Sequence, residues 1–182
     1  MYNSLAVFCG SKLGKNPNYE ADAKALGKWM ATHNITLIYG GGSVGIMGAI
    51  ANSVMDNGGE VKGVIPKVLL EWEQEHNNIS ELHVVEDMHI RKKMMYEMCD
   101  AAVILPGGHG TLDELFEMLT WNTLKIHSKK IFLLNTDGYY QHLIAHIEHM
   151  TKEGFLYENW RERLIVADSV EFIFDFLDGD KN

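Results

Sequence analysis

The stretch AAVILPGGHGTLDEL, residues 101–115, contains residue types that bind an anion. Gly107 and Gly108 follow a short apolar run, and successive glycines can turn their N–H groups toward one point to form an anion-binding nest. Thr111 adds a hydroxyl group near the expected start of a helix, where free N–H groups and the helix dipole also favour a phosphate. The pattern therefore predicts a phosphate-binding loop.

Two carboxylates, Asp113 and Glu114, lie within one turn of this loop, where a bound phosphate would repel them. One interpretation is structural: Thr111 and Glu114 have the S/T-x-x-E spacing of a capping box, and the helix dipole favours Asp113. The other is chemical: an acid acts on the ligand, and a nearby cation offsets its charge. The spacing alone favours the capping box.

The stretch MHIRKKMM, residues 88–95, supplies candidate cations. On a helix Arg91 and Lys92 point to different faces, so at least one can turn toward the ligand. Arg91 is the better candidate for the pocket, because a guanidinium group binds phosphate through two parallel hydrogen bonds, whereas Lys acts as a point charge. For Lys92 and Lys93 a solvated helix start is the stronger interpretation.

An anion loop, an arginine and a carboxylate together describe a site for a sugar phosphate or a nucleotide. Cleavage of an N-glycosidic bond passes through a transition state that resembles an oxocarbenium ion. A fixed carboxylate stabilises that positive charge or activates the attacking water. The hypothesis is that the phosphate loop and the acid hold opposite ends of one ribose 5-phosphate.

A second glycine loop, YGGGSVGIMG, matches G-x-G-x-x-G through Gly40, Gly42 and Gly45. In a dinucleotide site this loop follows the first strand, and an acid ends the next strand. Here the loop follows the second apolar run, and Glu60 precedes the third. A nicotinamide or flavin cofactor is therefore disfavoured. Two interpretations stay open: phosphate binding, or close packing of a helix on a strand.

Short apolar runs alternate with segments of helical periodicity along the whole chain. This alternation predicts an α/β fold: a doubly wound, Rossmann-like parallel sheet with helices on both faces, in a single domain spanning residues 1–182. In such sheets ligands bind beyond the carboxyl ends of the strands, where the glycine loops fall. The expected strands lie within residues 5–10, 35–40, 61–66, 82–87, 101–106, 130–135 and 163–168.

Composition narrows the class of protein. The chain has 182 residues, 46% hydrophobic content and a net charge of −9, which argues against a nucleic-acid-binding surface. Cys9 and Cys99 lie in apolar surroundings and are expected to be buried free thiols of a reducing compartment. The first residues, MYNSLAVFCG, do not resemble a signal peptide, and no apolar run is long enough to cross a bilayer. We expect a cytoplasmic protein without membrane contact.

Three histidines, His142, His146 and His149, share one face of an expected helix. The first two have the i, i+4 spacing of metal ligands, but no HExxH motif accompanies them. A solvated or interface helix is favoured, and no metal is expected.

The motif PGGHGTLDE at 106–114 resembles the PGGxGTxxE signature of the Lonely Guy (LOG) family, the cytokinin riboside 5'-monophosphate phosphoribohydrolases. The likeness extends over nearly the whole chain. It includes FCGS at 8–11, YGGGSVGIMG at 39–48, GVIPK at 63–67, MHIRK at 88–92, LTWNTLKIHSK at 119–129, LLNTDGYY at 133–140 and EGFL at 153–156.

The resemblance implies hydrolysis of a nucleoside 5'-monophosphate to free base and ribose 5-phosphate, without a cofactor, by a homodimer. It implies that Arg91 and Glu114 are the catalytic pair. AMP and cytokinin nucleotides are both candidate substrates. The substrate contacts that it implies are Glu73, Lys92, Gly107, Gly108, His109, Gly110, Thr111, Asp113 and Thr120.

A second reading on the same fold is a non-catalytic carrier of a nucleotide or of a molybdenum cofactor. Such a carrier would keep the phosphate loop but would not need an arginine paired with a carboxylate. The presence of both Arg91 and Glu114 favours the enzyme. The chain departs from the family pattern at Ile90, Lys125 and Lys130, which leaves the choice of base open.

Overall fold

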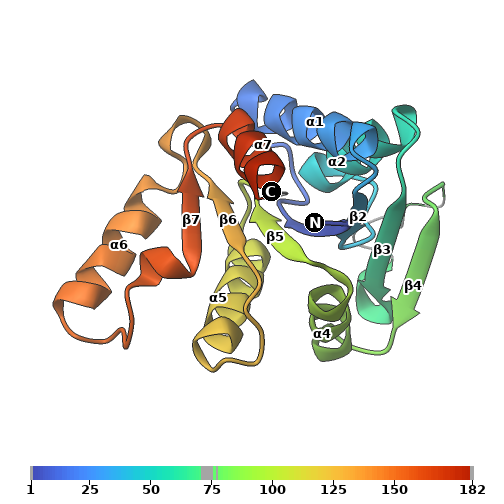
Figure 1. Ribbon diagram of the computed structural model, residues 1–182. Helices are drawn as coiled ribbons and strands as arrows, with labels where there is room; N and C mark the ends of the chain where they lie inside the picture. The colour runs from blue at the N-terminus through green and yellow to red at the C-terminus, as the bar shows by residue number, and fades with distance from the viewer. Residues whose placement is uncertain (1, 71–75, 77, 181–182) are drawn as a thin grey trace.

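The computed structural model describes residues 2–70, 76 and 78–180, and in it seven strands form one parallel sheet (Figure 1). The strand order is β4-β3-β2-β1-β5-β6-β7. The strands are β1 Ser4–Phe8, β2 Thr36–Tyr39, β3 Val61–Pro66, β4 Glu81–Val85, β5 Ala101–Ile104, β6 Ile131–Leu134 and β7 Leu164–Ala167. Each strand overlaps one of the expected apolar runs, with β1 and β4 beginning one residue before theirs, so the predicted doubly wound α/β fold is confirmed.

The chain builds the sheet outward in two directions from β1. Strand β1 pairs with β2 on one side and with β5 on the other, so the order of the strands reverses between β1 and β5. Ligands of doubly wound folds bind at this switch point, beyond the carboxyl ends of the strands. The loops after β1, β2 and β5 therefore surround the expected site.

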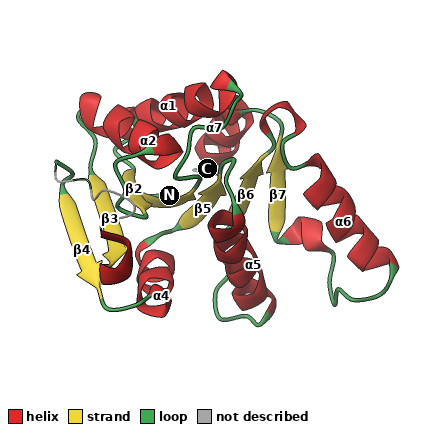
Figure 2. Cartoon of the chain, turned by 180° about the vertical axis from the view of Figure 1, so that it is seen from behind, coloured by secondary structure: helices red, strands yellow, loops and turns green. Residues whose placement is uncertain are grey.

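Helices cover both faces of the sheet, as Figures 1 and 2 show from opposite sides. Alternate residues of β1 point to opposite faces: Leu5 and Val7 join one core cluster, whereas Ala6 and Phe8 join the other. The first cluster contains residues of α1 Pro17–Thr32, α2 Gly45–Asp56 and α7 Val170–Gly179. The second contains residues of α4 Met88–Met98, α5 His109–Thr123 and α6 Gln141–Lys152.

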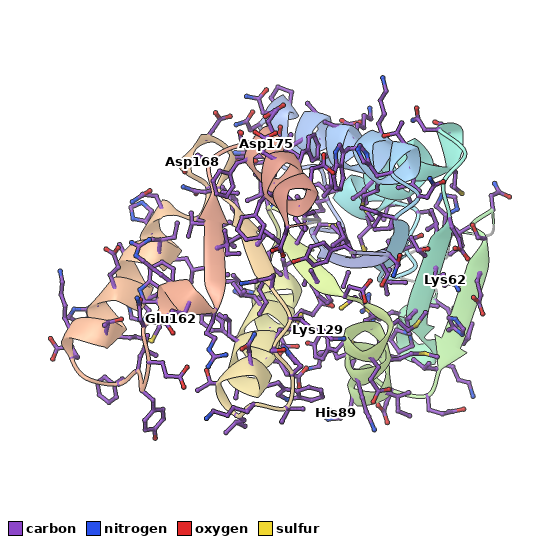
Figure 3. All side chains as sticks on the ribbon, in the orientation of Figure 1. Lys62, His89, Lys129, Glu162, Asp168 and Asp175 are labelled. Atoms are coloured by element: carbon purple, nitrogen blue, oxygen red, sulfur yellow. The ribbon has the colours of Figure 1, made fainter. Side chains whose placement is uncertain are left out.

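Both ends of α4 are fixed by side chains, and this places Arg91. The Asp87 carboxylate accepts hydrogen bonds from the backbone N–H of His89 at 2.8 Å and of Ile90 at 2.9 Å, so the helix begins at Met88. At the other end the Lys129 ammonium, labelled in Figure 3, donates to the Cys99 carbonyl at 2.6 Å. The negative end of the helix dipole also favours a cation at this position.

The remaining features concern the cysteines, the apolar helices and the groups of possible metal ligands. Cys9 and Cys99 are buried and are not joined in a disulfide, as expected. In the part of the chain that the structure describes, no helix has the length and apolar content needed to cross a membrane. The same described residues contain no group of three or more His, Cys, Asp or Glu side chains arranged to hold a metal ion.

Candidate active site

A cavity of about 280 Å³ lies at the switch point of the sheet. Its walls come from the loop after β1, from Gly40 after β2, from Arg91 of α4, and from the start of α5 as far as Glu114. This volume is near the lower end of the range for small-molecule sites, about 300 Å³ and above. The cavity therefore joins segments that are far apart in the sequence around space for one small ligand.

The guanidinium group of Arg91 is held in one orientation inside this cavity. Arg91 is only 4% exposed. Its Nε donates a hydrogen bond to the Val64 carbonyl at 3.1 Å, and its Nη2 donates to the Gly40 carbonyl at 3.1 Å. A buried charge held by fixed acceptors acts more strongly on a ligand than one in water. Arg91 thus turns toward the strand ends, as predicted.

The glycine loop after β2 makes close approaches that other residues would block. A Cβ atom at Gly40 would lie 2.1 Å from Nη2 of Arg91. At Gly45 the backbone has a φ of 63°, and a Cβ atom would lie 2.3 Å from the carbonyl carbon of Ser11. Gly40 and Gly45 therefore permit close packing, but their neighbours are the Arg91 side chain and the loop after β1, not a strand as in the packing interpretation.

The capping-box interpretation of Thr111 and Glu114 is wrong. Helix α5 begins at His109 with Gly108 as its N-cap, and no side chain caps it. Glycine is an accepted N-cap residue, and here the N-cap lies three residues ahead of Thr111. Glu114 consequently lies inside the helix, is 8% exposed, and lines the cavity.

Lys92 turns toward α5. Its ammonium lies 3.0 Å from a carboxylate oxygen of Asp113 and 3.0 Å from one of Glu117. Burial opposes the charged form of Lys92, but hydrogen bonds to these two carboxylates outweigh it and raise the pKa of the ammonium above its ordinary value. Lys92 is therefore a buried, charged link between α4 and α5, and the predicted solvated helix start is wrong for this residue.

The structure brings most of the predicted site residues together. Gly108, His109, Gly110 and Thr111 line the cavity with Arg91 and Glu114. Glu73, a further predicted contact, lies outside the described residues.

Two other predicted contacts line different cavities. Gly107 faces an adjoining cavity of about 260 Å³ with Tyr139, whose hydroxyl donates to the Gly107 carbonyl at 2.6 Å. Thr120 lies in a separate, apolar cavity of about 320 Å³, and its hydroxyl donates to the Phe116 carbonyl at 2.7 Å. Within this single chain, Thr120 is thus not part of the cavity that holds Arg91 and Glu114.

Sequence reasoning missed Tyr96 and Glu117. The Tyr96 hydroxyl donates to a carboxylate oxygen of Glu117 at 2.9 Å, the same oxygen that pairs with Lys92. One signal was present: Glu117 follows Asp113 by four residues, so the two carboxylates share a face of α5. Nothing in the local sequence indicated that a lysine and a tyrosine of α4 would meet that face.

Comparison with known proteins gives consistent results. The family model described as "Possible lysine decarboxylase" matches residues 47–177. The chain is 45% identical to a cytokinin riboside 5'-monophosphate phosphoribohydrolase of Rhodococcoides fascians, over 92% of this chain and 85% of that protein. It is 44% identical to the Arabidopsis thaliana enzyme of the same name, LOG4, over 93% of this chain and 79% of that one.

Solved structures of lower sequence identity share the fold. The molybdenum cofactor carrier protein of Chlamydomonas reinhardtii aligns with a TM-score of 0.70 at 20% identity, over 98% of each chain. The molybdenum cofactor binding protein of Rippkaea orientalis aligns with a TM-score of 0.74 at 19% identity, over 100% of this chain and 99% of that one. With relatives above 40% identity matched over nine-tenths of its length, the chain belongs to the Lonely Guy family of cytokinin riboside 5'-monophosphate phosphoribohydrolases.

Proposed function

We propose that the protein hydrolyses the N-glycosidic bond of a nucleoside 5'-monophosphate and releases the free base and ribose 5-phosphate. One observation carries this proposal: a single cavity joins the phosphate loop at the start of α5, the buried guanidinium of Arg91 and the buried carboxylate of Glu114. The relatives above 40% identity bear the name of this activity.

The geometry suggests how the substrate binds. The N-terminus of α5 offers free N–H groups and the positive end of its dipole to the 5'-phosphate. With the phosphate there, the ribose extends toward Glu114, which lies one and a half turns further along the same helix. Arg91 faces the same space from α4 and offsets the negative charges of the phosphate and the carboxylate.

In the reaction the C1'–N bond breaks as positive charge develops on the ribose. The Glu114 carboxylate stabilises this charge or takes a proton from the attacking water, whose oxygen forms the new bond to C1'. The departing base takes up a proton. Because Glu114 is 8% exposed, its charge acts with little screening by water.

Two other activities fit the site less well. A molybdenum cofactor carrier has the same fold, but the likeness to such carriers is at 20% identity or below in the two cases above, and carriage does not require a paired arginine and carboxylate. A decarboxylase that uses pyridoxal phosphate needs a lysine that can lose its proton. In Lys92 two carboxylates favour the protonated form and raise the pKa despite burial.

The test is base release from purified protein. We expect AMP or isopentenyladenosine monophosphate, incubated separately, to yield free base and ribose 5-phosphate in equal amounts by chromatography, with the ratio of the two rates identifying the preferred substrate. Tight binding of either nucleotide without base release would instead support the carrier.

We further propose that the protein is a cytoplasmic homodimer. The apolar cavity that contains Thr120 lies between α5 and α6, and large apolar side chains are exposed around it. Monomers rarely expose such groups together. Thr120 lies on this same face. A contact between Thr120 and substrate, which the family resemblance implies, then requires a second copy of the chain. The exposed apolar residues at or near this face are Phe116, Leu124, Ile126, Phe155 and Tyr157.

Replacing Phe155, which is 77% exposed, by Arg is expected to convert the dimer into a monomer, because an arginine at the interface must be desolvated. Light scattering after size-exclusion chromatography measures the mass. The matched control is Phe172→Arg on α7, also exposed and outside this face, which should leave the mass unchanged. A wild-type protein that is monomeric at micromolar concentration would refute the proposal.

A further inference from the structure

A partly buried polar cluster joins α4 to α5 beside the proposed catalytic pair. The Lys92 ammonium lies 3.0 Å from Asp113 and 3.0 Å from Glu117. The Tyr96 hydroxyl donates to Glu117 at 2.9 Å and lies 3.3 Å from the backbone carbonyl oxygen of Glu114. We call Lys92, Tyr96, Asp113 and Glu117 the α4–α5 clamp.

The clamp is next to the catalytic pair on both helices. Arg91 immediately precedes Lys92 on α4, and Glu114 immediately follows Asp113 on α5. The two members of the pair therefore belong to different helices, and their separation depends on how those helices are held together. A displacement of about 1 Å at reacting groups can reduce a rate by about a hundredfold.

The clamp is anchored in the core through Tyr96. Tyr96 is 2% exposed, and its ring packs edge-on against Phe8 at 5.8 Å and Trp121 at 5.3 Å. Burial, and after it the hydrogen bond to Glu117, raises the pKa of Tyr96 well above its usual range, so the phenol keeps its proton and continues to donate. The Lys92 side chain is 9% exposed and that of Glu117 is 23% exposed, so this ion pair is largely shielded from solvent, whereas the carboxylate of Asp113 is 57% exposed.

We propose that Lys92, Tyr96 and Glu117 are positioning residues, which set the separation of Arg91 and Glu114, and that Lys92 acts through the clamp instead of touching the substrate. This inference rests on the proposed function. It assigns a role to two residues that the family resemblance did not indicate, and it changes the role of Lys92. Two carboxylates already engage the Lys92 ammonium, and Arg91 provides the cation that lines the cavity.

The test compares Glu117→Gln, Tyr96→Phe and the double variant with the wild type. Glutamine keeps the shape of Glu117 but removes the charge that holds Lys92, and phenylalanine keeps the ring of Tyr96 but removes the hydroxyl. We expect kcat to fall about tenfold in Glu117→Gln, with the KM for the nucleotide unchanged within about twofold. The double variant should lose no more than Glu117→Gln alone, because both changes act through one carboxylate.

Lys93→Met is the matched control, since Lys93 is adjacent in sequence and its side chain is 64% exposed in a surface pair with Glu97. It should leave kcat and KM unchanged. Thermal unfolding establishes that every variant is folded. A rise in KM with unchanged kcat in Glu117→Gln would overturn the inference and make Lys92 a substrate ligand. Independent, multiplicative losses in the double variant would also overturn it.

A wild-type protein that releases no base would refute the proposed function but still leave the clamp testable. Crystal structures of the wild type and of Glu117→Gln then decide. The inference requires the separation of the Arg91 guanidinium and the Glu114 carboxylate to differ between the two structures. An unchanged separation would refute it.

Discussion

Replacing Glu114 by Gln is expected to lower kcat for base release by about 10²- to 10³-fold while KM changes little. The side chain is 8% exposed and lines the cavity, and glutamine preserves its size and hydrogen-bonding reach. The substitution removes the negative charge that faces the developing oxocarbenium ion. Loss of one preorganised electrostatic group in a catalytic site costs about this much.

Two measurements separate the possible roles of Glu114. Steady-state kinetics with AMP or isopentenyladenosine monophosphate gives kcat and KM, and calorimetry gives the affinity for the nucleotide. Glu97→Gln on α4 is the control, because that carboxylate is 65% exposed and should tolerate the change. Full turnover in Glu114→Gln would exclude Glu114 from catalysis, whereas loss of binding together with turnover would make it a binding residue.

The fold was predictable because parallel strands buried on both faces are continuous apolar runs. Each strand of the structure overlaps one expected run, and its ends differ from the expected ones by no more than two residues. The start of α5 was not predictable from the S/T-x-x-E spacing, because residues inside a helix satisfy that spacing as readily as those at its end. Gly108 provided an earlier N-cap.

Some features of the site could be predicted from a local motif, whereas others depend on contacts between residues that are distant in the sequence. The segment from Gly108 to Thr111 is a local motif, and the structure places it, as the N-cap and first turn of α5, in the cavity. The direction of Lys92 and the separate position of Thr120 depend on how α4 and α5 are rotated against their neighbours. The hydrogen bond from Arg91 to Gly40 joins residues 51 apart in sequence, and no local pattern contains it.

That long-range contact leads to a paired prediction for the glycines of the loop after β2. In Gly40→Ala the new methyl group would meet Nη2 of Arg91 at 2.1 Å. The end of a flexible side chain can move, so we expect a folded protein whose Arg91 is displaced and whose kcat is about a hundredfold lower. In Gly45→Ala the methyl group would meet the backbone of Ser11 and Lys12 at 2.3–2.4 Å. Backbone atoms cannot move aside as easily as the end of a side chain.

Gly45→Ala is therefore expected to reduce the free energy of unfolding by about 2–5 kcal/mol, the sum of strain at positive φ and overpacking. Gly58→Ala isolates the first of these, because Gly58 has a φ of 78° and a Cβ atom there meets nothing within 4 Å. Denaturant unfolding and kcat, measured on all three variants, separate the effects. If Gly40→Ala kept full activity, Arg91 would not depend on its contact with Gly40, and its fixed orientation would not be part of catalysis. If it lost stability as Gly45→Ala does, the loop would serve packing alone.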